Sequence, residues 1–330
     1  MYSYSASQWL LFFFIYCFLG WIWESCYVSI KQGKWVNRGF LRGPILPIYG
    51  SGAIIVLLAT LPVRDNLFLT FFLGMTAATI LEYFTGEAME ALFHVRYWDY
   101  SNQPFNLNGH ICLTSSIAWG FFSILMVKVL HLPIDNFVTA IPEELAQILG
   151  YILTAAIAID AATSFREAMD LKDMLKHMAE HNGELKRMRK RLDVVIAVID
   201  SDRRELVRRI GGEIDELGVK LQERRDNFDL EDLKPEWISE KAWTDLSEGI
   251  KSCTAQIIKM KENLDEKKLP GYREILAELE DFKERLSLEK KYSDQEGKKK
   301  SKRFKRLLKG NPSAVSDKYK VFLEELKNKF

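Results

Sequence analysis

Seven ionisable residues lie between two strongly apolar segments, in the stretch LEYFTGEAMEALFHVRYWDYSNQPFNLNGHICLTSSIAWG at residues 81–120. They are Glu82, Glu87, Glu90, His94, Arg96, Asp99 and His110. An ionisable group in hydrocarbon is costly, and it is kept mainly where it faces protein or a water-filled cavity. Acids in such a cavity could bind cations or relay protons. The stretch therefore predicts a functional polar cavity.

A helix would gather most of these side chains on one side. At about 100° per residue, the polar sector spans about 140° and holds Glu82, Gly86, Glu90, Tyr83, His94 and Glu87. The opposite sector holds Ile80, Phe84, Ala91, Ala88, Leu81 and Leu92, which suit lipid or neighbouring helices. A simpler interpretation stays open, in which the three glutamates pair with Arg38, Arg42 or Arg96 at the membrane interface.

The elements that must position these residues are five apolar segments of about 20 residues, the length that crosses about 30 Å of hydrocarbon. We place the spans at residues 8–30, 45–63, 67–86, 111–130 and 145–164, within a transmembrane domain at residues 1–165. Only seven of the 46 Lys and Arg residues precede Arg166. The fold class is therefore all-α: a polytopic membrane protein followed by a water-exposed helical region.

Charge in the loops predicts the orientation, because short loops rich in Lys and Arg stay cytoplasmic. The connections after the first, third and fifth spans are the basic ones, which places the N-terminus outside and the C-terminal half in the cytoplasm. The intramembrane acids then converge on the cytoplasmic side. The predicted inward-facing cavity comprises Glu24, Arg38, Arg42, Glu82, Glu87, Glu90, His94, Arg96, Asp99, His110 and Asp160.

The first loop, NRGFLRGPILPIYGSG, crowds glycine and proline at the start of the second span. It predicts either a broken or re-entrant start that lines a cavity, or an ordinary turn and a kinked helix. Between the third and fourth spans, Tyr97, Trp98, Tyr100 and Phe105 suit the headgroup level. Alternatively, Asp99 and His110 close the inner mouth of the cavity.

The spacing of Cys and His residues in the sequence gives little support for a metal or cofactor site. The four cysteines have no zinc-ligand spacing and predict no disulfide framework. The run His177 to His181 matches the HxxEH pattern of some zinc hydrolases. It lies on a charged helix with no evident pocket or third ligand, so we expect no metal, no cofactor and no catalytic residue there.

After Phe165 the sequence becomes strongly charged and predicts cytoplasmic helices. Apolar residues recur every seven positions at Leu171, Met178, Leu185, Leu192, Ile199 and Leu206. This period predicts a coiled-coil helix at residues 166–228, which could form a homo-oligomer or pack against later helices of the chain. We expect a helical region at 229–296, a basic tract at 297–312 and a terminal helix at 313–330.

The basic tract contains eight cationic side chains: Lys298, Lys299, Lys300, Lys302, Arg303, Lys305, Arg306 and Lys309. It could lie on anionic lipid of the inner leaflet. Nucleic acid is the competing partner, and a solvated tract is the simplest alternative. Phe304, Leu307 and Leu308 among the charges favour membrane lipid over nucleic acid.

Several motifs carry a resemblance: GWIWES, NRGFLRGPILPIYG, LEYFTGEAMEALF and WDYSNQPFNLNGHICLTSSIAWG. Residues 8–165, which contain these motifs, resemble the family of bacterial membrane proteins called Putative ABC-transporter type IV. The resemblance implies a multi-pass protein of a bacterial plasma membrane, the permease part of a transporter. The chain lacks the GxxxxGK[ST] loop that holds nucleotide phosphates, so ATP hydrolysis would require a separate ATP-binding subunit.

Three functional hypotheses follow. The first is a permease-like subunit with an inward-facing polar cavity. Because five spans are few for a transporter monomer, this hypothesis predicts a homo-oligomer or a partner permease. The second is a membrane-anchored scaffold or signalling protein that acts through its cytoplasmic coiled coil. The third is an intramembrane enzyme that uses the cluster from Glu82 to His110 on a lipid or carbohydrate substrate.

Overall fold

The computed structural model describes residues 4–209, 243–244, 247–252, 255, 277–278, 281–282, 284–285 and 302–329. Regular structure in these ranges is helical, together with two isolated β-bridges, Arg96–Val315 and Leu107–Ile111. The chain forms two compact units. The first is Met1–Asp173 with Arg303–Asn328, and the second is essentially Met174–Lys302.

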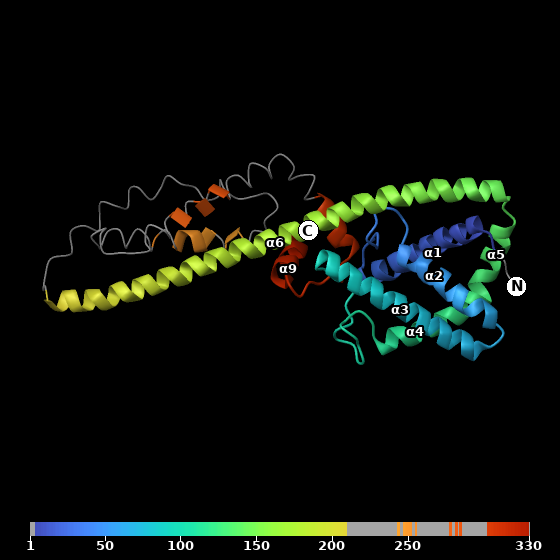
Figure 1. Ribbon diagram of the computed structural model, residues 1–330, viewed down its shortest axis with the longest axis horizontal. Coiled ribbons are helices and arrows are strands. Elements are labelled where there is room, and N and C mark those ends of the chain that lie inside the picture. Colours follow the sequence, from blue (N-terminus) through green and yellow to red (C-terminus); the bar gives the residue numbers. More distant parts are fainter. Residues whose placement is uncertain are drawn as a thin grey trace. The chain divides into compact units, whose positions relative to one another are not determined.

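The first unit is built from apolar helices that pack in chain order, α1 on α2, α2 on α3 and α3 on α4 (Figure 1). Their bounds are α1 Ala6–Gln32, α2 Pro47–Thr60 with the 3-10 turn η1 Leu61–Val63, α3 Leu67–Phe93, α4 Leu113–Leu125, η2 Met126–Leu130, α5 His131–Thr139 and α6 Glu143–Arg209.

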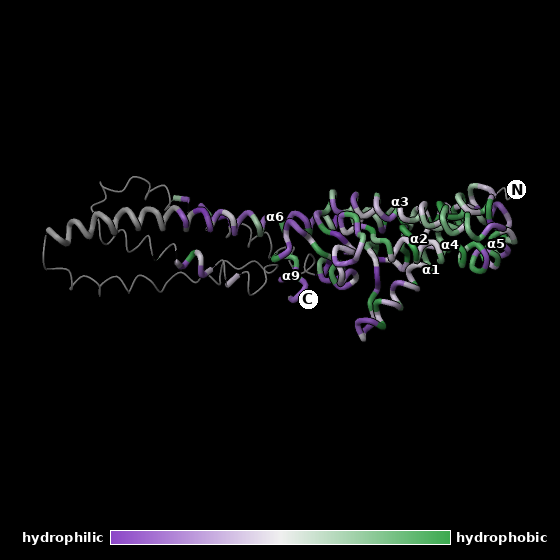
Figure 2. The backbone as a smooth tube through the Cα atoms, turned by 90° about the horizontal axis from the view of Figure 1, so that it is seen from below, coloured by the Kyte–Doolittle hydropathy of each residue, from purple (hydrophilic) through white to green (hydrophobic). Residues whose placement is uncertain are grey.

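Four helices are long and apolar enough to cross a membrane: Ala6–Gln32, Leu67–Phe93, Leu113–Thr139 and Glu143–Glu184. The first three have 27 residues each, about 40 Å at 1.5 Å per residue. Pro47–Val63 is a shorter apolar helix. Hydrophobic residues are concentrated in the helices α1 to α5 (Figure 2). The structure thus supports an all-α membrane protein with four long candidate spans.

The second apolar helix is short because the first loop returns along α1 before α2 begins. The Leu46 N–H donates to the carbonyl of Cys17, 3.0 Å away and 15 residues before the end of α1. Glycine permits the close approach: a Cβ on Gly50 would lie 2.4 Å from the Cys17 Sγ. α2 itself begins at Pro47 and runs without a break to Thr60, so the re-entrant form expected for this loop stays a prediction.

The helix expected to span residues 111–130 continues to Thr139 in the structure. Pro133 would normally stop it, because proline lacks an N–H and clashes with the preceding turn. The chain instead widens into the π-helix η2, in which the His131 N–H donates to the Met126 carbonyl. This wider turn lets α5 follow α4 without a break.

In the second unit, α6 lies against later residues of the same chain. The His181 ring packs edge-on against Phe282, with ring centroids 5.4 Å apart, and Phe282 is fully buried. The Arg285 guanidinium binds both oxygens of Glu184. These contacts agree with the packing alternative for the heptad pattern. Residues 210–228, the last part of the predicted coiled coil, lie outside the described residues, as does most of 229–296.

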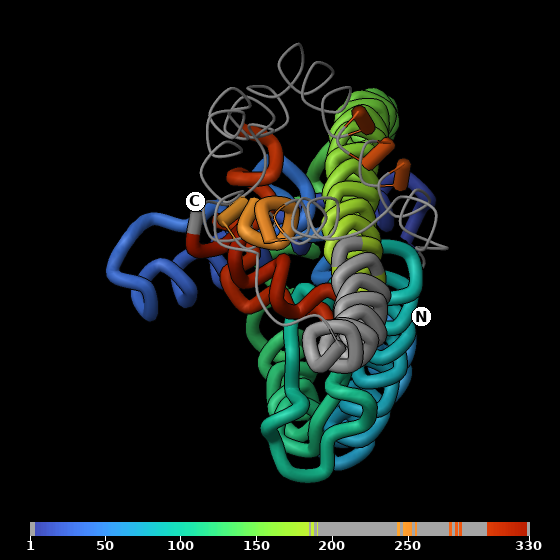
Figure 3. The backbone as a smooth tube through the Cα atoms, turned by 90° about the vertical axis from the view of Figure 1, so that its left-hand side faces the viewer, coloured from blue at the N-terminus to red at the C-terminus, as the bar shows by residue number. Residues whose placement is uncertain are grey.

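Residues 302–329, here called the C-terminal segment, belong to the first unit except for the end residues Lys302 and Lys329. Residues 302–310 are helical, 311–319 run without a helix, and α9 is Lys320–Lys329, a later start than the expected 313. Phe304, Leu307 and Leu308 are buried. The segment lies beside the loops after α1 and α3 (Figure 3). Lys298, Lys299 and Lys300 of the basic tract lie outside the described residues.

Candidate functional site

A cavity of about 600 Å3 opens where α3 ends. Its walls come from the last turns of α3, the loop between α3 and α4, and the C-terminal segment. The lining residues are Glu87, Glu90, Ala91, Arg96, Ser101, Asn106, Asn108, Gly109, His110 and Asp317. Most of them are charged or polar, so the cavity suits a polar ligand.

The loop reaches α3 because glycine and left-handed backbone let it turn tightly. His94 ends α3 with φ 55°, and Asn108 and Gly109 have φ 52° and 74°. A Cβ on Gly86 would lie 2.9 Å from the His110 Nδ1, so only glycine leaves room for this ring. Asn and Gly adopt such conformations at low cost, whereas most residues do not.

Charged groups in the cavity form one connected network. The Glu90 Oε2 lies 3.3 Å from the His110 Nε2 and 3.9 Å from the Arg96 Nη1. The Arg96 Nη2 donates to Asp317 at 2.8 Å, and Nη1 donates to the carbonyl of Asn108 at 3.2 Å. Glu87 is exposed and has no charged partner among the residues that the structure describes. The network leaves a surplus of carboxylate at the mouth of the cavity.

Asp99 stabilises the position of Arg96 in this network. Partial burial alone would raise the pKa of its carboxyl, but hydrogen bonds from the Ser101 hydroxyl and N–H, with the charge of Arg96, lower that pKa below its ordinary value. The Asp99 Oδ1 lies 4.0 Å from the Arg96 Nε. Asp99 is therefore ionised at neutral pH and holds Arg96 in place.

Glu82 lies deeper and does not line this cavity. It is 7% exposed, and its two oxygens accept hydrogen bonds from the Tyr100 hydroxyl at 3.1 Å and the Trp119 Nε1 at 2.9 Å. Burial and the neighbouring Glu82 raise the pKa of Tyr100, which keeps that hydroxyl a donor. Sequence reasoning did not find these two donors, which are 18 and 37 residues away from Glu82.

Glu24 and Arg38 form a second polar group. The Tyr49 hydroxyl donates to the Glu24 Oε1 at 2.6 Å, and the Arg38 Nε lies 3.6 Å from its Oε2. The Arg38 guanidinium also donates to Asn311 Oδ1 at 2.8 Å and to the carbonyl of Tyr97 at 3.2 Å. Arg38 therefore joins the first loop to the loop after α3 and to the C-terminal segment.

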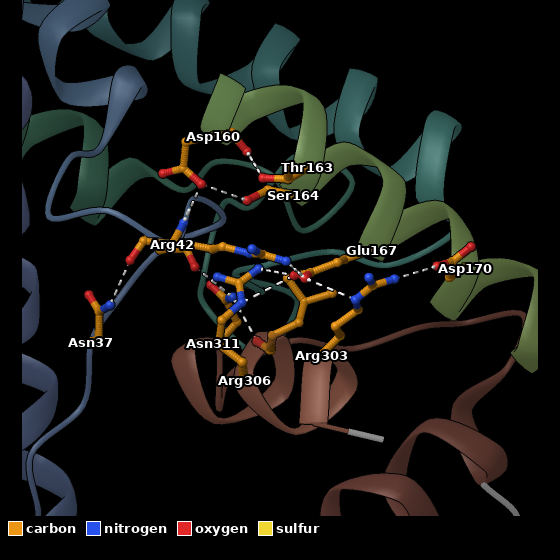
Figure 4. Close-up of polar contacts among 12 residues, drawn as sticks. Asn37, Arg42, Asp160, Thr163, Ser164, Glu167, Asp170, Arg303, Arg306 and Asn311 are labelled. Carbon is orange, nitrogen blue, oxygen red and sulfur yellow. Dashed lines mark hydrogen bonds and ion pairs between the residues drawn. The ribbon is translucent and has the colours of Figure 1, made fainter. Parts of the chain in front are cut away.

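A third polar group lies on α6, where the Glu167 carboxylate contacts three arginines (Figure 4). The Glu167 side chain is 2% exposed and contacts the guanidinium groups of Arg42, Arg303 and Arg306. Two turns earlier, the Asp160 carboxylate accepts the N–H groups of Arg42 at 3.1 Å and Gly43 at 2.7 Å. α6 thus anchors both the first loop and the C-terminal segment.

Residues 311–319 cross the ends of both loops. The Asn311 Nδ2 donates to the carbonyl of Gly39 at 3.0 Å, and the Ser313 hydroxyl donates to that of Tyr97 at 3.0 Å. Val315 and Arg96 exchange two backbone hydrogen bonds of 2.8 Å. The segment therefore forms one wall of the cavity, which Asp317 completes.

His94 points away from the cavity. Its ring centroid lies 6.0 Å from that of Tyr319, and its carbonyl accepts from the Ser316 hydroxyl. Partial burial, together with the charges of Lys318 and Lys172, lowers the pKa of its imidazole. Its role in this structure is to end α3 and to receive the C-terminal segment.

The predicted cavity residues thus fall into three groups. Glu87, Glu90, Arg96 and His110 line the cavity, with Asp99 next to Arg96. Glu82, Glu24 and Arg38 form deeper contacts, and Arg42 of the first loop meets Asp160 of α6. His94 belongs to none of these groups, because it contacts the C-terminal segment. Asp317 and Glu167 were missed, since no local motif marks either residue. Their partners lie more than 100 residues away along the chain.

Comparison with known protein families gives a match for the membrane part of the chain. Residues 11–165 match the model of the family described as Putative ABC-transporter type IV. This part of the chain is similar to that family. Together with the four long candidate spans, the match shows a membrane protein. The matched range ends before Glu167, so it covers α1 to α5 and the start of α6 but not the C-terminal segment. No curated protein and no solved structure matches the chain.

Proposed function

We propose that the chain is a permease-like subunit of a transporter, with its polar cavity facing the cytoplasm. The observation that carries the proposal is the cavity at the end of α3, where Glu90 faces His110 and Arg96 and Glu87 is a further lining carboxylate. A cavity that combines carboxylates with one histidine, at the end of a candidate span, suits the binding of a polar solute or the relay of protons.

Two features support five spans with the N-terminus outside. Pro47–Val63 would extend about 25 Å at 1.5 Å per residue, and the returning first loop supplies the remaining depth. The loops after α1 and α3 carry Arg38, Arg42 and Arg96, as cytoplasmic loops do. In a bacterial plasma membrane, this orientation places the cavity and the C-terminal segment in the cytoplasm.

The family suggests a separate ATP-binding subunit as the partner. We therefore propose to purify the tagged full-length chain in mild detergent and to identify the proteins that co-purify. The expected result is an ATP-binding subunit, and ATP hydrolysis by the complex reconstituted in vesicles. If membrane crosslinking and purification both recover the chain without such a subunit, the permease proposal fails.

The cavity is tested on the same complex with Glu90→Gln. The change keeps the size of the side chain but removes the charge that faces His110 and Arg96, so we expect an altered rate of ATP hydrolysis. Glu180→Gln is the matched control, because Glu180 is an exposed acid of α6 that pairs with Lys176. Equal rates of ATP hydrolysis in the two variants would show that the cavity takes no part in the mechanism.

A second candidate function is a membrane-anchored scaffold, which the length of α6 favours. This helix runs for 67 residues, from the membrane unit into the second unit. A coiled coil formed by its distal part would bind a soluble partner or a second copy of the chain. The same purification separates the two proposals, because a scaffold recovers soluble proteins without an ATP-binding subunit and is indifferent to Glu90→Gln.

A further inference from the structure

We propose that the C-terminal segment and the first loop together form a binding site for the phosphate headgroups of anionic phospholipids. The site, here called the basic surface, consists of Arg42, Lys302, Arg303, Lys305, Arg306 and Lys309. The proposal concerns lipid binding and is independent of whether the protein transports a solute.

The arginines around Glu167 carry more charge than their acidic partners neutralise. Glu167 is the shared partner of Arg42, Arg303 and Arg306, and Asp170 lies 3.8 Å from Arg303. The three arginine side chains stay 44%, 37% and 28% exposed. A guanidinium has five N–H donors, so each arginine can bind Glu167 and still offer donors to a phosphate.

The lysines add charge on the outer side of the same short helix. At 100° per residue, Lys302, Lys305 and Lys309 share one face, whereas Phe304, Leu307 and Leu308 occupy the opposite, buried face. Arg303 and Arg306 lie between the two faces and reach Glu167. The three lysines have no ion-pair partner in the part of the chain that the structure describes. They form a continuous cationic stripe beside the arginines.

The level of the site along α6 argues for lipid rather than a soluble anion. Apolar side chains of α6 are exposed as far as Ile159 and Phe165, 68% and 45% respectively. Glu167 follows Phe165 by two residues, about 3 Å along the helix axis. Trp35, in the loop that contacts the C-terminal segment, is 67% exposed, as residues at a membrane interface are. The arginines therefore lie where apolar surface gives way to charge, at headgroup depth.

The test measures which lipids the full-length protein retains in mixed micelles of phosphatidylcholine and phosphatidylglycerol, by native mass spectrometry. The variant is the triple change Lys302→Gln, Lys305→Gln and Lys309→Gln, which leaves the arginine contacts with Glu167 intact. Each lysine near an anionic surface contributes about fivefold in affinity, so we expect a loss of about a hundredfold for phosphatidylglycerol. The matched control removes three exposed lysines elsewhere, Lys186, Lys190 and Lys320.

The expected result is preferential retention of phosphatidylglycerol by the wild type and the control, and its loss in the triple variant. Hydrogen exchange of residues 311–316 must remain slow in both variants, which shows that the segment is still docked. Equal retention by the triple variant and the control would overturn the proposal. Displacement of the lipid by millimolar inorganic phosphate would also overturn it, because the site would then bind free anions.

Discussion

The change Glu167→Gln should release the C-terminal segment from the membrane unit. The carboxylate is 2% exposed and contacts three guanidinium groups, so its removal leaves three positive charges close together. Breaking a buried ion pair on one side costs about 3–5 kcal/mol. Since the arginines are 28–44% exposed and can be rehydrated, we expect a smaller cost of about 2 kcal/mol for docking of the segment.

Hydrogen exchange measures this release directly. The Val315 N–H donates to the carbonyl of Arg96 while the segment is docked, whereas the N–H groups of Asn311 and Ala314 donate within the segment itself. A cost of about 2 kcal/mol corresponds to about 30-fold faster exchange of the Val315 amide, since each 1.4 kcal/mol is a factor of ten. Exchange elsewhere in the first unit should change little, because α1 to α4 pack on one another without the segment.

Asp170→Asn is the matched control. Among the residues that the structure describes, Asp170 pairs with Arg303 alone, at 3.8 Å, and its side chain is 29% exposed, so we expect at most about a twofold change in exchange. Exchange within twofold of the wild type in Glu167→Gln would refute the argument. The segment would then be held by its backbone and apolar contacts, and the arginine cluster would contribute nothing to docking.

Three further predictions concern the loops. Gly86→Ala should lower the thermal midpoint by an amount equivalent to about 1–3 kcal/mol, since the new Cβ would lie 2.9 Å from His110, whereas Gly52→Ala has ordinary space and should be neutral. Asp160→Ala should cost about 2 kcal/mol and speed amide exchange in the first loop, because two backbone N–H groups lose a charged acceptor. The folded-state pKa of His94 is lowered, so the stability that it contributes is complete above about pH 6.5 and is lost as the pH falls through the folded pKa. His94→Asn, which tolerates the left-handed backbone, should abolish this pH dependence in melts taken on either side of pH 6.5.

The sequence predicted the features that follow from local patterns. The length of the apolar segments predicted the helices, and the azimuth of α3 predicted a polar sector that contains Glu82 and Gly86. In the structure both residues are buried, while Ile80, Phe84 and Leu92 of the opposite sector are exposed. These predictions depend only on helical geometry and on the cost of charge in hydrocarbon. Glu90 also lies near Arg96, one of the arginines named in the interface alternative, although at 3.9 Å the contact is long.

The contacts of the C-terminal segment could not be predicted in this way. In the sequence, Arg306 is one of several cations in a basic tract, and Glu167 is one of several acids on a charged helix. Their side chains nevertheless form a hydrogen bond, although the two residues are 139 positions apart. Nothing in either local sequence specifies the partner, since the pairing depends on how the segment returns to the first unit. The two backbone hydrogen bonds between Arg96 and Val315 are even harder to predict from the sequence, because any residue other than proline can form them.

The docked C-terminal segment also changes how truncations of this protein must be interpreted. A chain cut after the fifth predicted span would lose Asp317 from the cavity wall and the three hydrogen-bonded residues that hold the loops, Asn311, Ser313 and Val315. Arg96 would then keep Glu90 and Asp99 as its acidic neighbours, so the charge balance of the cavity would shift. Loss of activity in such a truncation would therefore not distinguish a scaffold from a permease. Single changes such as Glu90→Gln make that distinction, because they alter the cavity and leave the second unit intact.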